Sequence, residues 1–278
     1  MKAIFDQISD SCSKHMTKTY STSFSLGINF LSKKFHVPIY GIYGFVRAAD
    51  EIVDSFHDFD KEKLMAKFRS DTVDAIEDRI SLNPILNSFQ NAVHAFNISW
   101  DSIDTFLKSM EMDLNPTLYK EDNYKQYIVG SAEVVGLMCL KVFSENDEKL
   151  YDALKPYARY LGSAFQKVNF LRDMKADFEV LGRTYFPNVN LHRFDTNDKL
   201  EIEADIEKDF KTALIGIKKL PSGARGGVYL AFVYYYKLFT KIKATPAQQV
   251  LTARIRIPNQ KKLVLMFQSL VKNKLNLL

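Results

Sequence analysis

Two pairs of aspartates stand in stretches that are otherwise almost wholly apolar. Asp50 and Asp54 lie in YGFVRAADEIVDSF, and Asp173 and Asp177 lie in NFLRDMKADF. Side chains four residues apart project from the same face of a helix, one turn apart. Like charges at this spacing destabilise a helix, and burying an unpaired carboxylate costs several kcal/mol more. Positive charge must therefore compensate each pair.

Polar residues extend each pair into a stripe along one helix face. In chain order, the two stripes are Tyr43, Arg47, Asp50 and Asp54, and Gln166, Asn169, Asp173 and Asp177. Two interpretations are open. Arg47 and Arg172 could neutralise the aspartates in buried ion pairs, or divalent cations could do so. Four carboxylates exceed two arginines, and such an excess inside a helical bundle favours the cations.

The chemistry of these ligands indicates which cation would bind. Carboxylates and the Asn169 carbonyl are hard oxygen donors, which suit Mg²⁺ and suit zinc or copper poorly. Mg²⁺ keeps several waters and shares its other positions with substrate phosphates. Two facing aspartate pairs therefore predict a diphosphate between them. The four-residue spacing alone is weak evidence, because it recurs at four other aspartate pairs, most of which we expect to be solvated: Asp6/Asp10, Asp54/Asp58, Asp74/Asp78 and Asp205/Asp209.

Long helices must position these stripes. The 8 prolines and 11 glycines are sparse and cluster between segments with helical spacing of apolar residues. Breaks are predicted at 57–63, 81–84, 115–117, 144–148, 182–198, 221–227 and 245–249, and no hairpin pattern or fixed repeat is present. We expect an all-α protein, with residues 1–278 forming one domain of about eight to eleven helices. Val37–Phe56 and Ala158–Phe178 are apolar on nearly every side, which places them in the middle of the bundle.

Composition limits the class of protein. The 46% hydrophobic and 26% charged fractions are ordinary for a globular protein, and the two cysteines have no zinc-binding spacing. The first residues lack the apolar core of a signal peptide, and GVYLAFVYYYKLF is too short to span a bilayer. We therefore expect a soluble or peripheral protein.

Charge is distributed unevenly along the chain. After Asp209, 13 Lys/Arg occur without an acidic residue, which indicates a polyanionic partner: nucleic acid, anionic lipid or a phosphorylated substrate.

Four separated blocks carry a family resemblance. RAADEIVD, NFLRDMKAD, YSTSFSLG at 20–27 and RTYFP at 183–187 together resemble the phytoene/squalene synthase family, over about Tyr20 to Lys262. MEMDL, GSAEVVGLM and ARIRIPNQKKL are most similar to bacterial phytoene synthases. The first motif reads DEIVD where many members have adjacent aspartates, and Glu51 keeps that charge.

The resemblance implies an all-α isoprenoid synthase fold, a single bundle around a central cavity with the aspartates at its mouth. It also implies a prenyltransferase of carotenoid biosynthesis. Two geranylgeranyl diphosphates would join head to head through a cyclopropylcarbinyl diphosphate, prephytoene diphosphate, giving phytoene and released diphosphate. Mg²⁺ is expected, with Mn²⁺ as a possible substitute, and no NADPH. The alternatives are a squalene or dehydrosqualene synthase using farnesyl diphosphate, and a non-catalytic scaffold relative.

The resemblance also assigns residues. Catalytic residues would be Tyr43, Arg47, Asp50, Asp54, Asp173 and Asp177, and the metal ligands would be Asp50, Asp54, Asn169, Asp173 and Asp177. Substrate-binding residues would be Tyr20, Ser21, Thr22, Ser23, Tyr43, Arg47, Gln166, Asn169, Arg172, Tyr234 and Arg254. Candidate cavity walls are Phe24, Val134, Leu137, Met138 and Phe165, although plain core packing explains each of these five better. Val129 stands where relatives often have tyrosine, on an expected helix Tyr124–Val142, and would thin a wall of the cavity.

Location follows from the substrates, which partition into membranes. We expect a cytoplasmic protein, peripheral at the inner face of the cytoplasmic membrane, whose basic carboxy-terminal third attracts anionic lipid. Nucleic-acid binding is not expected, because no recognised module accompanies the basic segment. The sequence leaves five properties open: the oligomeric state, the choice between C15 and C20 substrates, the product isomer, the final proton acceptor, and the effect of Val129 in place of an aromatic residue.

Overall fold

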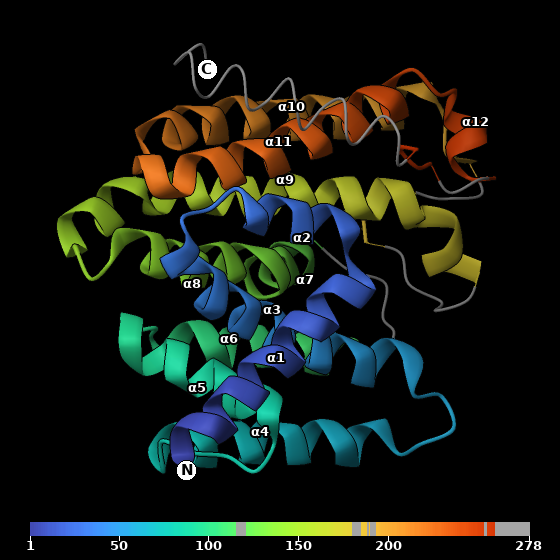
Figure 1. Ribbon diagram of the computed structural model, residues 1–278. Helices are drawn as coiled ribbons and strands as arrows, with labels where there is room; N and C mark the ends of the chain where they lie inside the picture. The colour runs from blue at the N-terminus through green and yellow to red at the C-terminus, as the bar shows by residue number, and fades with distance from the viewer. Residues whose placement is uncertain (115–120, 180–184, 188, 190–192, 253–254, 259–278) are drawn as a thin grey trace.

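The fold is known from a computed structural model, which describes residues 1–114, 121–179, 185–187, 189, 193–252 and 255–258. The side chains of Glu121 and of residues 175–179 lie outside this description. The described part holds helices and no strands (Figure 1). They are α1 (Lys2–Tyr20), α2 (Thr22–Asn29), α3 (Lys33–Ser55), α4 (Lys61–Glu77), α5 (Pro84–Phe96), α6 (Trp100–Met112), α7 (Glu121–Ile128), the π-helix η1 (Val129–Glu133), α8 (Val134–Ser144), α9 (Glu148–Glu179), α10 (Thr196–Lys219), α11 (Ser222–Lys243) and α12 (Ala247–Val250).

Capping residues explain several of the helix boundaries. Asn83 accepts from the amide of Ile85 at 3.0 Å, and Asp195 with Asp198 forms a reciprocal capping box at the start of α10. Asn97 and Glu145 end α5 and α8 in the left-handed conformation, each with φ 49°. The predicted breaks at 57–63, 81–84, 144–148 and 245–249 each contain a junction between helices, but α4 begins inside the first of them, at Lys61, and α12 begins inside the last, at Ala247. The break at 221–227 is shorter than predicted, because α11 already begins at Ser222.

The all-α prediction is confirmed. Twelve α-helices and one π-helix occupy the described residues, slightly more than expected, because α12 is a single four-residue turn and α2 and α7 have eight residues each. The two apolar segments predicted for the middle of the bundle lie within α3 and α9. Phe45 of α3 is fully buried and stacks on Phe89 of α5, with ring centroids 3.9 Å apart. Helix α9 packs against α8, α10 and α11.

The expected helix Tyr124–Val142 is not one regular α-helix. It consists of α7, η1 and α8, because five residues from Val129 to Glu133 adopt the wider π-helical turn. A π-helical turn holds more residues than an α-turn, so it rotates every following side chain around the helix axis. Gly130 lies inside η1 against α6, where an added Cβ would stand 2.5 Å from the Ser109 Cβ. The close approach to α6 therefore requires glycine there.

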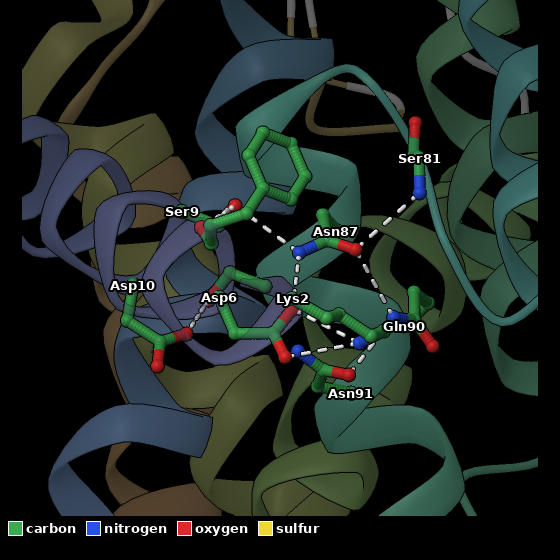
Figure 2. A network of polar contacts seen from close by, with 10 residues as sticks. Lys2, Asp6, Ser9, Asp10, Ser81, Asn87, Gln90 and Asn91 are labelled. Atoms are coloured by element: carbon green, nitrogen blue, oxygen red, sulfur yellow. Dashed lines mark hydrogen bonds and ion pairs between the residues drawn. The ribbon is translucent and has the colours of Figure 1, made fainter.

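Helices α1 and α5 are joined by a polar network (Figure 2). The fully buried Asn87 donates to Asp6 Oδ1 at 2.9 Å and to Ser9 Oγ at 3.1 Å, and Ser88 donates to Asp10 at 2.7 Å. The expectation that Asp6 and Asp10 are plainly solvated is therefore wrong. Their carboxylates satisfy donors that α5 buries, which is what buried amide and hydroxyl groups require.

Asp122–Ser144, which spans α7, η1 and α8, is the one helical stretch of the described chain that is long and apolar enough to cross a membrane. Of its most apolar window, 61% is buried inside the protein. A helix in a protein core meets the same criterion, so length and composition alone do not assign this stretch to a membrane.

Candidate active site

An elongated cavity of about 330 Å³ lies between α3 and α9, and apolar side chains form most of its wall. Helices α2, α8, α10 and α11 complete the wall together with residues of η1. Small residues allow this arrangement. A Cβ added to Gly162 of α9 would stand 2.5 Å from the carbonyl oxygen of Ala132, so glycine lets α9 approach η1 closely.

The two ends of the cavity differ in polarity. At one end Tyr43 of α3 interacts electrostatically with Tyr235 of α11, whose hydroxyl donates to Asn169 Oδ1 of α9 at 3.4 Å. At the other end Phe143 and Leu154 line the cavity within the apolar core. Along both α3 and α9 the later residues lie toward the polar end, and both helices run from left to right in Figure 1. The next turns of both helices therefore extend beyond the same end of the cavity.

Beyond the polar end, α3 carries an arginine held by two carboxylates. Arg47 donates to Asp50 Oδ2 at 2.6 Å and also pairs with Glu51. Burial lowers the pKa of Arg47, but the charges of Asp50 and Glu51 outweigh it and raise the pKa above its ordinary value. The Arg47 guanidinium lies 4.2 Å from the centroid of the Tyr20 ring, a cation–π contact. Asp54 follows one turn after Asp50 and is partly buried.

One donor of this arginine is left over. Arg47 Nε is buried and has no hydrogen-bond partner in the described part of the chain. An unsatisfied buried donor costs about 1–3 kcal/mol, and more when the group is charged. This position is therefore prepared for an acceptor that the described residues do not supply.

Helix α9 presents the matching arrangement. Arg172 Nε donates to both carboxylate oxygens of Asp173, at 3.0 and 3.1 Å. Burial lowers the pKa of Arg172, but its hydrogen bond to Asp173 and the charge of that carboxylate raise it overall. Asn169 donates to Gln166 Oε1 at 3.4 Å, and both of these residues line the cavity. Asp177 lies on α9, and its side chain is outside the described residues.

The start of α2 brings hydroxyl groups to the same end. Ser21 caps α2 by accepting from the amide of Phe24 at 3.2 Å. Burial raises the pKa of Tyr43 to about 12, while Arg47 and a hydrogen bond with Ser21 act in the opposite direction. Tyr43 is therefore neutral at physiological pH. Thr22 is exposed and Ser23 is partly buried in the first turn of α2.

The arrangement has counterparts among known proteins. The sequence profile of squalene/phytoene synthases matches residues 17–261. The chain belongs to the squalene/phytoene synthase family. It is 27% identical over 194 residues to a 4,4'-diapophytoene synthase from Staphylococcus haemolyticus, covering 68% of this chain and 65% of that protein. It is 25% identical over 192 residues to a phytoene synthase from Mycobacterium bovis, covering 67% and 60%. The chain thus aligns with less than two thirds of the length of these relatives.

Solved structures confirm the fold of the family. The crystal structure of a dehydrosqualene synthase in complex with a ligand superposes with a TM-score of 0.83, covering 97% of this chain and 98% of the other at 18% identity. The isoprenoid synthase fold expected from the sequence motifs is therefore confirmed.

The cavity wall differs in part from the one expected for the family. Phe24 and Phe165 line the cavity as predicted, and Phe165 stacks on Tyr235 with ring centroids 4.0 Å apart. The other three candidates are buried away from it, as core packing predicts: Val134, Leu137 and Met138. Their neighbours line it instead, namely Val135, Gly136, Cys139 and Leu140. The π-helical turn before α8 rotates this helix, so α-helical spacing counted from the motif selects the wrong positions.

Three predicted positions need comment. Val129 is absent from the cavity wall and packs against the apolar core at the start of η1, so the prediction that it thins the wall is wrong. Tyr235 lines the cavity, whereas Tyr234 packs beside it, and their ring centroids are 5.9 Å apart. Arg254 lies outside the described residues.

Tyr235 could have been identified from its spacing. Val228 and Ala231 precede it by seven and four residues, on the same helical face, and both line the cavity. Val228, Ala231 and Tyr235 therefore contribute one side of the cavity wall, with the tyrosine hydroxyl as its polar group. The run of three tyrosines at 234–236 obscures this pattern unless the face is traced backward along α11.

The donor set can be tested for Mg²⁺. Within the described residues, no three His, Cys, Asp or Glu side chains are grouped closely enough to hold a metal ion by themselves. Asp50, Asp54, Asp173 and Asn169 are nevertheless hard oxygen donors at one end of the cavity, and Mg²⁺ needs only one or two protein carboxylates when phosphate oxygens and water complete its shell. The residues fit a site that substrate completes. The ion pairs of the competing interpretation, Arg47 with Asp50 and Arg172 with Asp173, are also present.

Proposed function

We propose that this protein is a prenyltransferase that condenses two allylic isoprenoid diphosphates head to head into a hydrocarbon precursor of carotenoids. The observation that carries the proposal is an apolar cavity whose polar end is bracketed by an Arg–carboxylate pair on each of two helices. A substrate with a long hydrocarbon chain and an anionic head group needs both an apolar cavity and a polar, positively charged end. Membership of the squalene/phytoene synthase family supports the same reaction class.

The anionic heads would bind at the polar end. Arg47 and Arg172 can donate in fork geometry to phosphate oxygens, and the buried Arg47 Nε would gain the acceptor that it lacks. Asp50, Asp54, Asp173 and Asn169, with Asp177 as a further proposed ligand, would hold Mg²⁺. When bound, Mg²⁺ supplies Lewis-acid stabilisation of the departing diphosphate. The hydroxyls of Ser21 and Tyr43 lie beside Arg47 and would orient the head group.

The cavity would protect the cation that forms when the first diphosphate leaves. Phe24, Phe165 and Tyr235 contribute aromatic rings to its wall, and aromatic faces attract cations while apolar walls exclude water. The second substrate's double bond attacks that cation, and loss of a proton gives a cyclopropylcarbinyl diphosphate. Ionisation of this intermediate, rearrangement and a second proton loss give the hydrocarbon. Neutral Tyr43 and Tyr235 contribute hydroxyl dipoles without competing charge.

We propose geranylgeranyl diphosphate as substrate and phytoene as product, because three motif blocks of the sequence are most similar to bacterial phytoene synthases. Farnesyl diphosphate is the second candidate, favoured by the large Phe143 and Leu154 side chains that close the far end of the cavity. The test is to incubate purified protein with Mg²⁺ and each diphosphate, measure released diphosphate, and identify the hydrocarbon by mass spectrometry. A chelator control tests metal dependence. Absence of any coupled hydrocarbon with both substrates would overturn the proposal.

A further inference from the structure

The outer face of α1 exposes apolar side chains. Ile4 is 62% exposed and Ile8, one turn later, is 53% exposed. Together with Cys12, Met16, Tyr20 and Ile85, they line an open groove of about 710 Å³ that is separate from the central cavity, and the uncharged polar or titratable side chains of Gln7, Ser11, His15 and Thr19 line the rest of it. A protein surface tolerates single apolar residues, but several exposed apolar side chains along one helix face indicate a binding partner.

The charges of α1 are sorted between its two faces. Both of its carboxylates face α5. Asp6 accepts from Asn87 of α5 and pairs with Lys2 within α1 (Figure 2), and Asp10 accepts from Ser88 of α5. Lys14 and Lys18 are exposed, and neither makes an ion pair with a described carboxylate. The solvent-facing side of α1 therefore presents apolar groups and positive charge without negative charge.

The groove is continuous with the candidate active site. Tyr20, the last residue of α1, lines one end of the groove and is 47% exposed. The same ring lies 4.2 Å from the Arg47 guanidinium, which marks the polar end of the cavity. An apolar chain lying in the groove would thus end next to the residues that we assign to the diphosphate.

We propose that this face of α1 docks on the surface of an anionic lipid bilayer, with Ile4 and Ile8 among the acyl chains and Lys14 and Lys18 at the headgroup phosphates. An amphipathic helix with lysines beside its apolar face has the chemistry of an interfacial helix. A second copy of the chain fits less well, because a stable dimer buries about 800 Å² per partner and a two-fold contact would bring these lysines toward their own counterparts. Docking is independent of the proposed reaction.

Vesicle flotation without substrate tests the surface. We expect the wild type to bind phosphatidylcholine vesicles weakly and vesicles with added phosphatidylglycerol strongly. Ile4→Asp/Ile8→Asp should lower partitioning into the anionic vesicles by at least about tenfold, since each isoleucine loses its apolar burial. Lys14→Glu/Lys18→Glu should lower the ratio of binding to anionic over neutral vesicles by about tenfold, since each of the two lysines contributes to the attraction while the basic carboxy-terminal third is unchanged.

A matched control uses exposed apolar residues elsewhere. Leu200 and Ile215 on α10 are 56% and 49% exposed, so Leu200→Asp/Ile215→Asp should bind as the wild type does. Equal loss in this control, or wild-type binding by Ile4→Asp/Ile8→Asp, would overturn the proposal. Circular dichroism and melting temperature check that each variant is folded.

Fluorescence gives a second readout at the residue itself. Trp100 is the single tryptophan of the chain, so Trp100→Phe with Ile8→Trp places one reporter on α1. We expect a blue-shifted emission with anionic vesicles and quenching by lipids brominated in the acyl chain. An unshifted, unquenched emission from vesicle-bound protein would overturn the assignment of α1. Because no substrate is present, these results do not depend on whether the condensation is observed.

Discussion

Two clusters in this molecule combine an acidic pair at four-residue spacing with a cation, which is buried in one cluster, Lys167, and partly buried in the other, Arg47. The two clusters serve different purposes. In the interface between α9 and α10, Lys167 pairs with Asp209 at 2.8 Å and with Asp205, and Asp209 also accepts from Ser163 at 2.7 Å. Asp209 is 3% exposed, so the expectation that this pair is solvated is wrong for one of its members. The burial of Asp209 is matched by donors from α9.

The cluster on α3 is built otherwise. Arg47 has two carboxylate partners, yet its Nε is buried without one in the described chain, and the cluster adjoins the cavity. Complete pairing across a packed interface indicates a structural role, whereas an unsatisfied donor beside a cavity indicates a ligand. The four-residue spacing of the aspartates therefore does not distinguish a structural cluster from a ligand site. Whether every buried hydrogen-bond donor of the cation has an acceptor does distinguish them.

The largest expected difference is in turnover. Asp→Asn at Asp50, Asp54, Asp173 or Asp177 should lower the rate of diphosphate release by a factor on the order of 10² or more, because each removes ligand charge that is needed when the leaving group departs. The melting temperature should change little. Wild-type rates in two or more of these variants would contradict the metal-site assignment.

At the cluster between α9 and α10 we expect the opposite result, a loss of stability without a loss of turnover. Lys167→Met should leave Asp209 buried without its cation and cost about 3–5 kcal/mol of the free energy of unfolding. Turnover of the folded fraction should stay near the wild-type value. The measurements are chemical denaturation and the rate per folded molecule, with Lys218→Met on the exposed surface of α10 as control. A large loss of turnover without loss of stability would place Lys167 in the active site.

A smaller effect is expected at the closed end of the cavity. Phe143→Leu shortens a side chain that lines this end and contacts Phe35 edge to face at 5.6 Å. The ratio of kcat/KM for the C20 substrate to that for the C15 substrate should rise by about tenfold or more, since even one methylene in an apolar pocket is worth about 1–3 kcal/mol. An unchanged ratio would mean that this end of the cavity does not limit chain length.

The smallest effect concerns pH. The pKa of Tyr43 is raised to about 12, chiefly by burial, so its contribution to stability is present below the ordinary pKa near 10 and is lost as pH rises toward 12. Tyr43→Phe should therefore lose less stability than the wild type between pH 10 and 12. Denaturation at a series of pH values checks this, with Tyr160→Phe, at an exposed position of α9, as the control. Identical pH dependence in the wild type and Tyr43→Phe would contradict the burial of this hydroxyl.

Much of the fold could be read from residue order. Apolar spacing predicted the segments that became α3 and α9, and local capping residues such as Asn83 and Asp195 placed helix starts without knowledge of tertiary contacts. The stripe Tyr43, Arg47, Asp50 and Asp54 follows from helical geometry alone, since 3.6 residues per turn brings these positions to one face. Such features depend on interactions within a few residues, which the sequence itself encodes.

Other features were decided by tertiary contact. The π-helical turn at Val129–Glu133 rotates α8, so Val135 and Cys139 face the cavity while Val134 and Met138 enter the core. Whether an aspartate pair is solvated, structural or poised for a ligand depends on what a distant helix brings to it. The sequence by itself determined the helices, the aspartate stripes and the family. Only packing decided which side chains line the cavity and which cation keeps an unsatisfied hydrogen-bond donor, because both properties depend on distances between elements that are far apart in the chain.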